Sequence, residues 1–262
     1  MQSITVREAG VAVNQACDVQ IWTASPADFD DAQWRELGVL LDSTERARSQ
    51  QFKQPADRRA YVLAHALRRI ALAQALQVAP AALSFSSDHR GKPLLRVPHN
   101  SGIFFSHAHS RALVACAVTR IGPVGIDVAC AQDGSADLDL LAGLVDLPDA
   151  RRREAEIGAD PAQQFLFYWS ALEAFWKAVG CGLSSANPPV RCQKNRQGRF
   201  EILLEASGPS SPQARVIALQ SPAACSMALA LTCTSERTIE MDVKVNYKHL
   251  GVALWPGQES DA

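Results

Sequence analysis

The sequence lacks several features that would assign its class at once. Positive and negative charges nearly cancel, with 26 Lys and Arg against 27 Asp and Glu, which argues against a general nucleic-acid binder. No uncharged apolar run is long enough to span a bilayer, and the first residues do not form a basic segment followed by a long apolar one. We therefore expect a cytoplasmic protein with no membrane and no nucleic-acid partner.

Cysteine pairs at metal-site spacing are also missing. The seven cysteines are irregularly spaced and include no CxxC pair, which favours reduced thiols over a disulfide framework. His107 and His109 alternate on an expected strand and so point the same way. With Cys116 and Cys130, or with Asp127, they leave a zinc site and a metallohydrolase open as an alternative.

The hydrophobic pattern predicts helices followed by strands, twice along the chain. In the first section we expect a strand over 19–24, a helical region over 30–50, and a helix capped by Asp57 and ending near Gln77. Strands are expected to follow over 83–87, 103–107 and 112–118. In the second section we expect a strand over 124–129 and helices over 136–157 and 161–180. Further strands are expected over 199–206, 214–220 and 224–232.

This order predicts a mixed α/β (α+β) fold. We expect a pseudo-twofold pair of similar subdomains, each a small, mainly antiparallel sheet packed with helices. The halves would cover 1–120 and 121–235, with a tail over 236–262. Two fused halves suit a monomer, and the cleft between them is where a ligand would bind.

Three charged residues stand out from apolar surroundings. Asp127 lies in the run VGIDVA, where it is either a turn-capping residue at a strand end or a ligand. Glu173 and Lys177 are four residues apart on one face of an aromatic-rich helix. They are either an ordinary surface pair or, at the edge of a core, groups that bind Mg²⁺ and phosphate together.

A basic segment precedes the first long helix. Arg58 and Arg59 stand at a helix start, where cations are disfavoured, and Arg46, Arg48 and Lys53 lie just upstream. These residues form either a solvated basic surface or an anion pocket for phosphates.

Five segments in order resemble the phosphopantetheinyl transferase superfamily of the larger, two-half (Sfp-like) type. The resemblance covers about residues 40–235, and the segments are DSTERARSQQFKQPADRRAYVLAHALRR (42–69), GKP (91–93), FFSHAHS (104–110), VGIDV (124–128) and WSALEAFWKAVGCGL (169–183). It implies an enzyme that transfers the 4′-phosphopantetheine arm of coenzyme A to a serine of an acyl or peptidyl carrier protein, with Mg²⁺ as cofactor.

The resemblance also implies roles for single residues. Asp127 and Glu173 would bind Mg²⁺, and Glu173 would also be the general base. Lys177 would contact the phosphates and stabilise the transition state. His107 would contact the 3′-phosphate of coenzyme A. Lys92 would line the nucleotide site, and either arginine of the pair Arg58 and Arg59 would contribute to its basic wall.

The chain departs from the family pattern at four positions. Ala129 replaces a frequent acid, Leu172 a Lys, Ala108 a Ser and Ala60 an Arg. The loss of an acid at Ala129 leaves the metal with one protein ligand fewer, which water can replace. The departures motivate a second hypothesis, a catalytically impaired family member that binds coenzyme A or a carrier protein without turnover.

Overall fold

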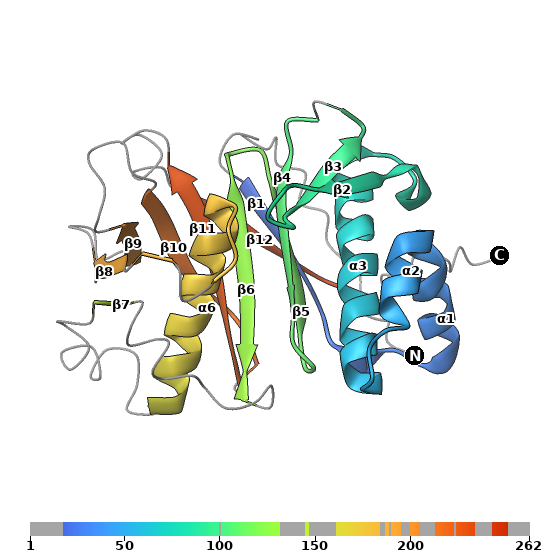
Figure 1. The fold of residues 1–262 in the computed structure, drawn as a ribbon, viewed down its shortest axis with the longest axis horizontal. Helices are drawn as coiled ribbons and strands as arrows, with labels where there is room; N and C mark the ends of the chain where they lie inside the picture. The colour runs from blue at the N-terminus through green and yellow to red at the C-terminus, as the bar shows by residue number, and fades with distance from the viewer. Residues whose placement is uncertain are drawn as a thin grey trace, which may run out of the picture.

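The computed structural model describes residues 18–99, 101–131, 145–146, 161–183, 187–188, 190–194, 200–204, 213–222, 224–233 and 243–250. It confirms the expected mixed α/β class: two mainly antiparallel sheets share a buried apolar core, and helices cover the opposite face of each sheet (Figure 1). Within the described residues, no helix combines the length and apolar character needed to cross a membrane.

The first sheet has four strands in the order β12-β1-β5-β4. Its strands are β1 (Asp18–Ala24), β4 (Phe104–His109), β5 (Val114–Thr119) and β12 (Lys244–His249). Strand β12 pairs with β1 in parallel, and the other neighbours are antiparallel. Part of the expected tail over 236–262 therefore returns to the first half as a sheet strand.

Three helices pack in this half: α1 (Asp31–Leu40), α2 (Ser43–Ser49) and α3 (Pro55–Leu76). Asp30 and Asp42 each form a capping box, which divides the expected helical region 30–50 into α1 and α2. Helix α3 begins with Pro55 at its first position, so the expected cap at Asp57 is wrong, because a proline there is already suited to a helix start. The helix ends as expected, with Gln77 in the left-handed region.

A two-stranded hairpin follows α3. It consists of β2 (Ser84–Ser87) and β3 (Pro93–Val97), of which only β2 was expected. Asp88 organises the turn between them, since its Oδ1 accepts hydrogen bonds from the backbone N–H groups of Arg90 (2.8 Å) and Lys92 (2.9 Å). Gly91 has a φ of 83°, a value that favours glycine.

The second sheet has six strands in the order β6-β11-β10-β9-β8-β7. They are β6 (Val124–Cys130), β7 (Val145–Asp146), β8 (Val190–Lys194), β9 (Phe200–Leu204), β10 (Gln213–Leu219) and β11 (Cys225–Cys233). The expected helix over 136–157 lies outside the described residues except at Val145–Asp146, which form the short strand β7.

Helix α6 (Pro161–Val179) covers β6, β11 and β10 (Figure 1). An apolar stripe faces the sheet from this helix, with Phe165, Leu172 and Trp176 buried and Trp169 half-buried. Gly180 ends the helix with a φ of 96°, and its N–H donates to the carbonyl of Trp176 at 3.0 Å.

Gly125 allows α6 to lie directly against β6. A Cβ at this position would lie 2.6 Å from the backbone nitrogen of Ala178 and would also clash with the backbone carbonyl of Ala174. Both obstacles belong to the helix backbone, which cannot give way as a flexible side chain would. The glycine of the VGIDV run therefore sets how closely the helix approaches the strand.

One expectation about the cysteines is wrong. Cys130 of β6 and Cys225 of β11 are register partners, with Cα atoms 4.0 Å apart, and form a disulfide. They are 95 residues apart in sequence, so only the strand pairing brings them together. Cys116 and Cys181 are free.

We predict that Gly125→Ala separates α6 from β6. The added methyl group has no room against the helix backbone, so the free energy of unfolding should fall by about 3 kcal/mol, as measured by urea denaturation. Gly122→Ala is the matched control, because a Cβ there meets its nearest atom at an ordinary 3.7 Å. Equal stability of the two variants would contradict the close approach described here.

Candidate active site

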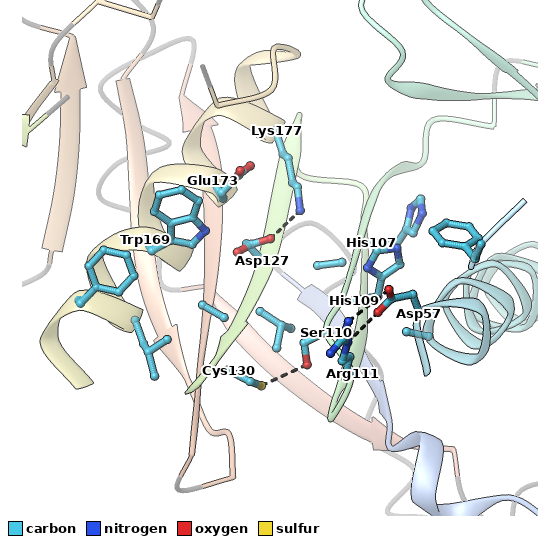
Figure 2. Close-up of a pocket in the computed structure, with 17 residues that line it drawn as sticks. Asp57, His107, His109, Ser110, Arg111, Asp127, Cys130, Trp169, Glu173 and Lys177 are labelled. Carbon is cyan, nitrogen blue, oxygen red and sulfur yellow. Dashed lines mark hydrogen bonds and ion pairs between the residues drawn. The ribbon is translucent and has the colours of Figure 1, made fainter. Parts of the chain in front are cut away.

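A cleft of about 760 Å³ lies where the two sheets meet. Strands β4 and β6, helix α6 and the first turns of α3 form its walls (Figure 2). Four residues predicted from the sequence line it together: His107, Asp127, Glu173 and Lys177. The structure thus brings the charged residues of two distant motifs into one space.

Lys177 and Asp127 form an ion pair in this cleft. The Lys177 Nζ lies 2.6 Å from Asp127 Oδ1 and 3.4 Å from the carbonyl oxygen of Ile126 (Figure 2). Asp127 is only 7% exposed, so its carboxylate needs this compensation. The pair joins α6 to β6 at the cleft wall.

Glu173 lies one turn before Lys177 on α6 and lines the same cleft. Burial and the nearby carboxylate of Asp127 raise the pKa of Glu173, although Lys177 and the backbone N–H of Leu183 act to lower it. Repulsion from Asp127 shows that the two carboxylates are electrostatically coupled. A cation between them would relieve that repulsion.

This donor set fits a magnesium ion that keeps much of its water. Asp127 and Glu173 offer hard carboxylate oxygens, and Mg²⁺ is commonly held by one or two carboxylates plus substrate phosphates. The part of the chain that the structure describes contains no group of three or more His, Cys, Asp or Glu placed to hold a metal. The zinc alternative therefore has no ligand set among those residues, and Cys130 is engaged in the disulfide.

Ser106 links the two sheets beside the ion pair. Strands β4 and β6 are the adjacent edges of their sheets, and the Ile126 N–H donates to Ser106 Oγ at 3.2 Å. This bond fixes the backbone immediately before Asp127. Ser106 was not predicted from the sequence as a site residue, although a serine in an apolar edge strand is a polar group that needs a partner.

His107 follows Ser106 and points to the other side of β4. Burial first, and then the positive charges of Arg68 and neighbouring groups including Lys177, hold its pKa well below the usual range, so its ring is neutral near pH 7. The His65 ring packs edge-on against it at 5.3 Å, and Tyr61 stacks on His65 at 4.0 Å. His107 thus offers a neutral ring held by aromatic packing.

A buried ion cluster lies behind His65. Glu45 is 6% exposed and accepts hydrogen bonds from Arg68 and from Arg69 Nε, the latter at 2.9 Å. Burial alone would raise the pKa of Glu45, but hydrogen bonds from His65 and the Asp42 N–H, with the charge of Arg68, lower it to about 2. The cluster fixes α2 against α3 and so supports the wall that carries His65.

A smaller pocket of about 200 Å³ adjoins the cleft, with His107 and Lys177 lining both. Lys92 lines it as well, but its Nζ donates to the carbonyl of Lys177 at 2.6 Å and faces that of Ala178 at 3.4 Å. From the same turn, Arg90 donates to Cys181 Sγ at 2.7 Å. The β2–β3 turn therefore holds the end of α6, a contact that compensates the negative end of the helix dipole.

Arg58 and Arg59 do not reach the cleft. Asp57 and Ala60 line it, whereas the two arginines line a separate groove on another face of α3. The helical period is the reason, because neighbouring positions on a helix project about 100° apart. At the cleft rim, Asp57 instead pairs with Arg111 at 2.7 Å (Figure 2).

The four departures from the family pattern occupy two kinds of place. Ala129, Ala60 and Ala108 line the cleft. Leu172 and Ala108 are buried in core clusters, at 0% and 5% exposure. Leu172 therefore contributes to packing beneath α6, whereas the other three departures lie at the cleft surface.

Comparisons with known proteins match both halves of the chain. The family described as "4′-phosphopantetheinyl transferase, N-terminal" matches residues 22–120, and the "4′-phosphopantetheinyl transferase superfamily" matches residues 123–228. The 4′-phosphopantetheinyl transferase HetI of Nostoc sp. is 32% identical over 169 residues, which are 64% of this chain and 70% of that protein.

Two further relatives match over a smaller share of their own length. The L-aminoadipate-semialdehyde dehydrogenase-phosphopantetheinyl transferase of Eremothecium gossypii is 32% identical over 59% of this chain and 56% of that protein. A 4′-phosphopantetheinyl transferase of Bacillus subtilis is 28% identical over 56% of this chain and 63% of that protein. This chain thus spans less than two thirds of each of these two proteins.

We predict that Lys92→Met loosens the last turn of α6. A hydrogen bond from a charged donor contributes about 1.5 kcal/mol, so amide hydrogen exchange at Gly180 and Cys181 should accelerate roughly tenfold. Lys92→Arg should retain most of the protection, because it keeps a cationic donor at the helix end. Unchanged exchange in Lys92→Met would show that the turn does not hold the helix.

Proposed function

The chain belongs to the 4′-phosphopantetheinyl transferase superfamily and is a 4′-phosphopantetheinyl transferase, and from this premise we propose its substrates and its metal. We propose that it transfers the phosphopantetheine arm of coenzyme A to a serine hydroxyl of an acyl or peptidyl carrier protein. Mg²⁺ is the proposed cofactor, and Asp127 and Glu173 are its proposed ligands.

The observation that carries the proposal is the convergence of Asp127, Glu173 and Lys177 in one cleft. Phosphoryl transfer depends on positioning and charge neutralisation, which require a hard cation, an ammonium group and a base close together. Asp127 and Glu173 would hold the cation, Lys177 is the ammonium group, and Glu173 is also the base. When bound, Mg²⁺ would neutralise charge on the diphosphate of coenzyme A.

Glu173 is the proposed general base, directly or through a water. Its raised pKa makes it a better proton acceptor than an ordinary glutamate, provided that it is ionised at the working pH. The serine oxygen would lose its proton to this carboxylate and form a bond to the phosphorus that carries the pantetheine arm. The bond from that phosphorus to the bridging oxygen would break, releasing adenosine 3′,5′-bisphosphate.

Lys177 is proposed to bind the phosphates and to stabilise the charge that develops on the leaving group. In the structure its ammonium pairs with Asp127, which keeps it in the cleft beside the two carboxylates. Residues on other walls would hold the nucleotide. His107, with its neutral ring, would donate a hydrogen bond to the 3′-phosphate, and Lys92 lines the adjoining pocket proposed for the nucleotide.

A second candidate is a family member that binds coenzyme A or a carrier protein with little or no turnover. Ala129 favours it, because it lies two residues beyond Asp127 and supplies no metal ligand. Leu172 does not add to this candidate, since its side chain lies in the core of the second half. Turnover measurements separate the two functions.

We predict Mg²⁺-dependent addition of phosphopantetheine to an apo carrier protein, measured by mass spectrometry with coenzyme A as donor. Chelation with EDTA should abolish the mass increase. Asp127→Asn and Glu173→Gln should each lower the rate at least a hundredfold, because each removes a charge from the metal site at nearly constant volume. No mass increase over a broad panel of carriers, with Mg²⁺ or Mn²⁺, would contradict the proposal.

We further predict that Ala129→Glu strengthens metal binding. Its position two residues from Asp127 on β6 places the new carboxylate on the same face of the strand. The concentration of Mg²⁺ that gives half-maximal activity should therefore fall severalfold. Ala115 is buried on β5 and does not line the cleft, so Ala115→Glu should unfold the protein instead. An unchanged Mg²⁺ requirement would show that the position lies outside the coordination sphere.

A further inference from the structure

The arginine pair of α3 belongs to a groove that the catalytic cleft does not include. This groove has a volume of about 620 Å³ and lies among α1, the segment 41–50 and the first turns of α3. Four arginines line it, and its lining contains no Asp or Glu; the arginines are Arg35, Arg46, Arg58 and Arg59. In Figure 1 the helices α1 and α2 lie on the side of α3 that faces away from β6 and α6.

The arginines of the groove have no acidic partner in the part of the chain that the structure describes. Among the described residues, no carboxylate forms an ion pair with any of the four. The nearby acids Asp42 and Glu45 are already engaged with Arg69 and, for Glu45, with Arg68. Like charges gathered in one groove repel each other, so an anionic partner would bind there favourably.

The groove also presents apolar surface. Val39 is 76% exposed, which is the highest exposure among the large hydrophobic residues of the described chain. Trp34 lines the same groove, with the Arg59 guanidinium 5.6 Å from its ring centroid. A pattern of aromatic and arginine side chains around an exposed aliphatic residue is typical of protein-binding surfaces.

The groove lies close to the cleft along the chain and in space. On α3, Asp57 and Ala60 face the cleft, while Arg58 and Arg59 face the groove. The two openings are therefore separated by about one helix diameter, roughly 10 Å. A standard protein interface of about 800 Å² per partner is roughly 30 Å across, so one protein can contact both.

We propose that this groove is a docking site for an acidic segment of the carrier protein, one that also presents an apolar side chain to Val39 and Trp34. The inference rests on the proposed function, since the partner is the macromolecule whose serine enters the cleft. Arginines of the groove bind carboxylates of the carrier and increase its local concentration at the cleft.

The test is charge reversal in the groove, with Arg58→Glu and Arg59→Glu combined. Both positions lie in the first turns of α3, where acidic residues suit the helix dipole, so the variant should fold. The matched control combines Arg96→Glu and Lys244→Glu, which change the net charge equally at exposed positions of β3 and β12.

Steady-state kinetics with coenzyme A and an apo-acyl carrier protein should show a rise of about tenfold or more in KM for the carrier in the groove variant alone. Its kcat and its KM for coenzyme A should stay within twofold of wild type, because the cleft is untouched. Raising the salt concentration should weaken carrier binding in wild type more than in the groove variant.

Three results would overturn the inference. One is an unchanged carrier KM in the groove variant, and another is an equal rise in the control. The third is a rise in KM for coenzyme A instead, which would assign the arginines to the nucleotide site as the sequence resemblance implied.

Carrier binding is also measured without turnover, by fluorescence anisotropy of a labelled apo-acyl carrier protein. Loss of binding in the groove variant supports the docking site even if wild type transfers nothing, in which case only the proposed reaction fails. Equal binding by wild type and the groove variant overturns the docking site whether or not transfer occurs.

Discussion

The direct contact between α6 and β6 at Gly125 is the constraint on which the candidate site depends. It brings the helix that carries Glu173 and Lys177 within reach of the strand that carries Asp127, two residues beyond the glycine. A larger residue at position 125 would hold the helix too far from the strand for Lys177 to reach Asp127. The ion pair between Lys177 and Asp127 follows from this approach, and it compensates a carboxylate that the same packing has buried.

The remaining contacts hold the first half of the molecule against that centre. Ser106 accepts a hydrogen bond from the backbone before Asp127, and Lys92 donates to the end of α6. The cleft is therefore formed by both halves: β4 and α3 come from the first half, and β6 and α6 from the second. Both contacts engage backbone groups of β6 and α6, and the side chains of Glu173 and Lys177 line the cleft.

The sequence contained enough to predict the elements around the site but not all their relations. Helical spacing predicted that Glu173 and Lys177 share a face, and the strand pattern of VGIDVA predicted β6. The direction in which each arginine of α3 projects depends on how the helix is rotated against its neighbours. Arg58 and Arg59 were expected at the nucleotide site, whereas they line a separate groove. The disulfide depends on the register of β6 and β11, which spacing between cysteines does not reveal.

The pairing of β12 with β1 has a consequence for the order in which the protein folds. A chain made from its N-terminus presents β1 and β5 long before residues 244–249 leave the ribosome. Until then β1 is an open edge whose backbone groups can pair with another chain. The first half therefore reaches its complete sheet only after the whole second half has been synthesised, and folding of the two halves during translation is linked by the last strand.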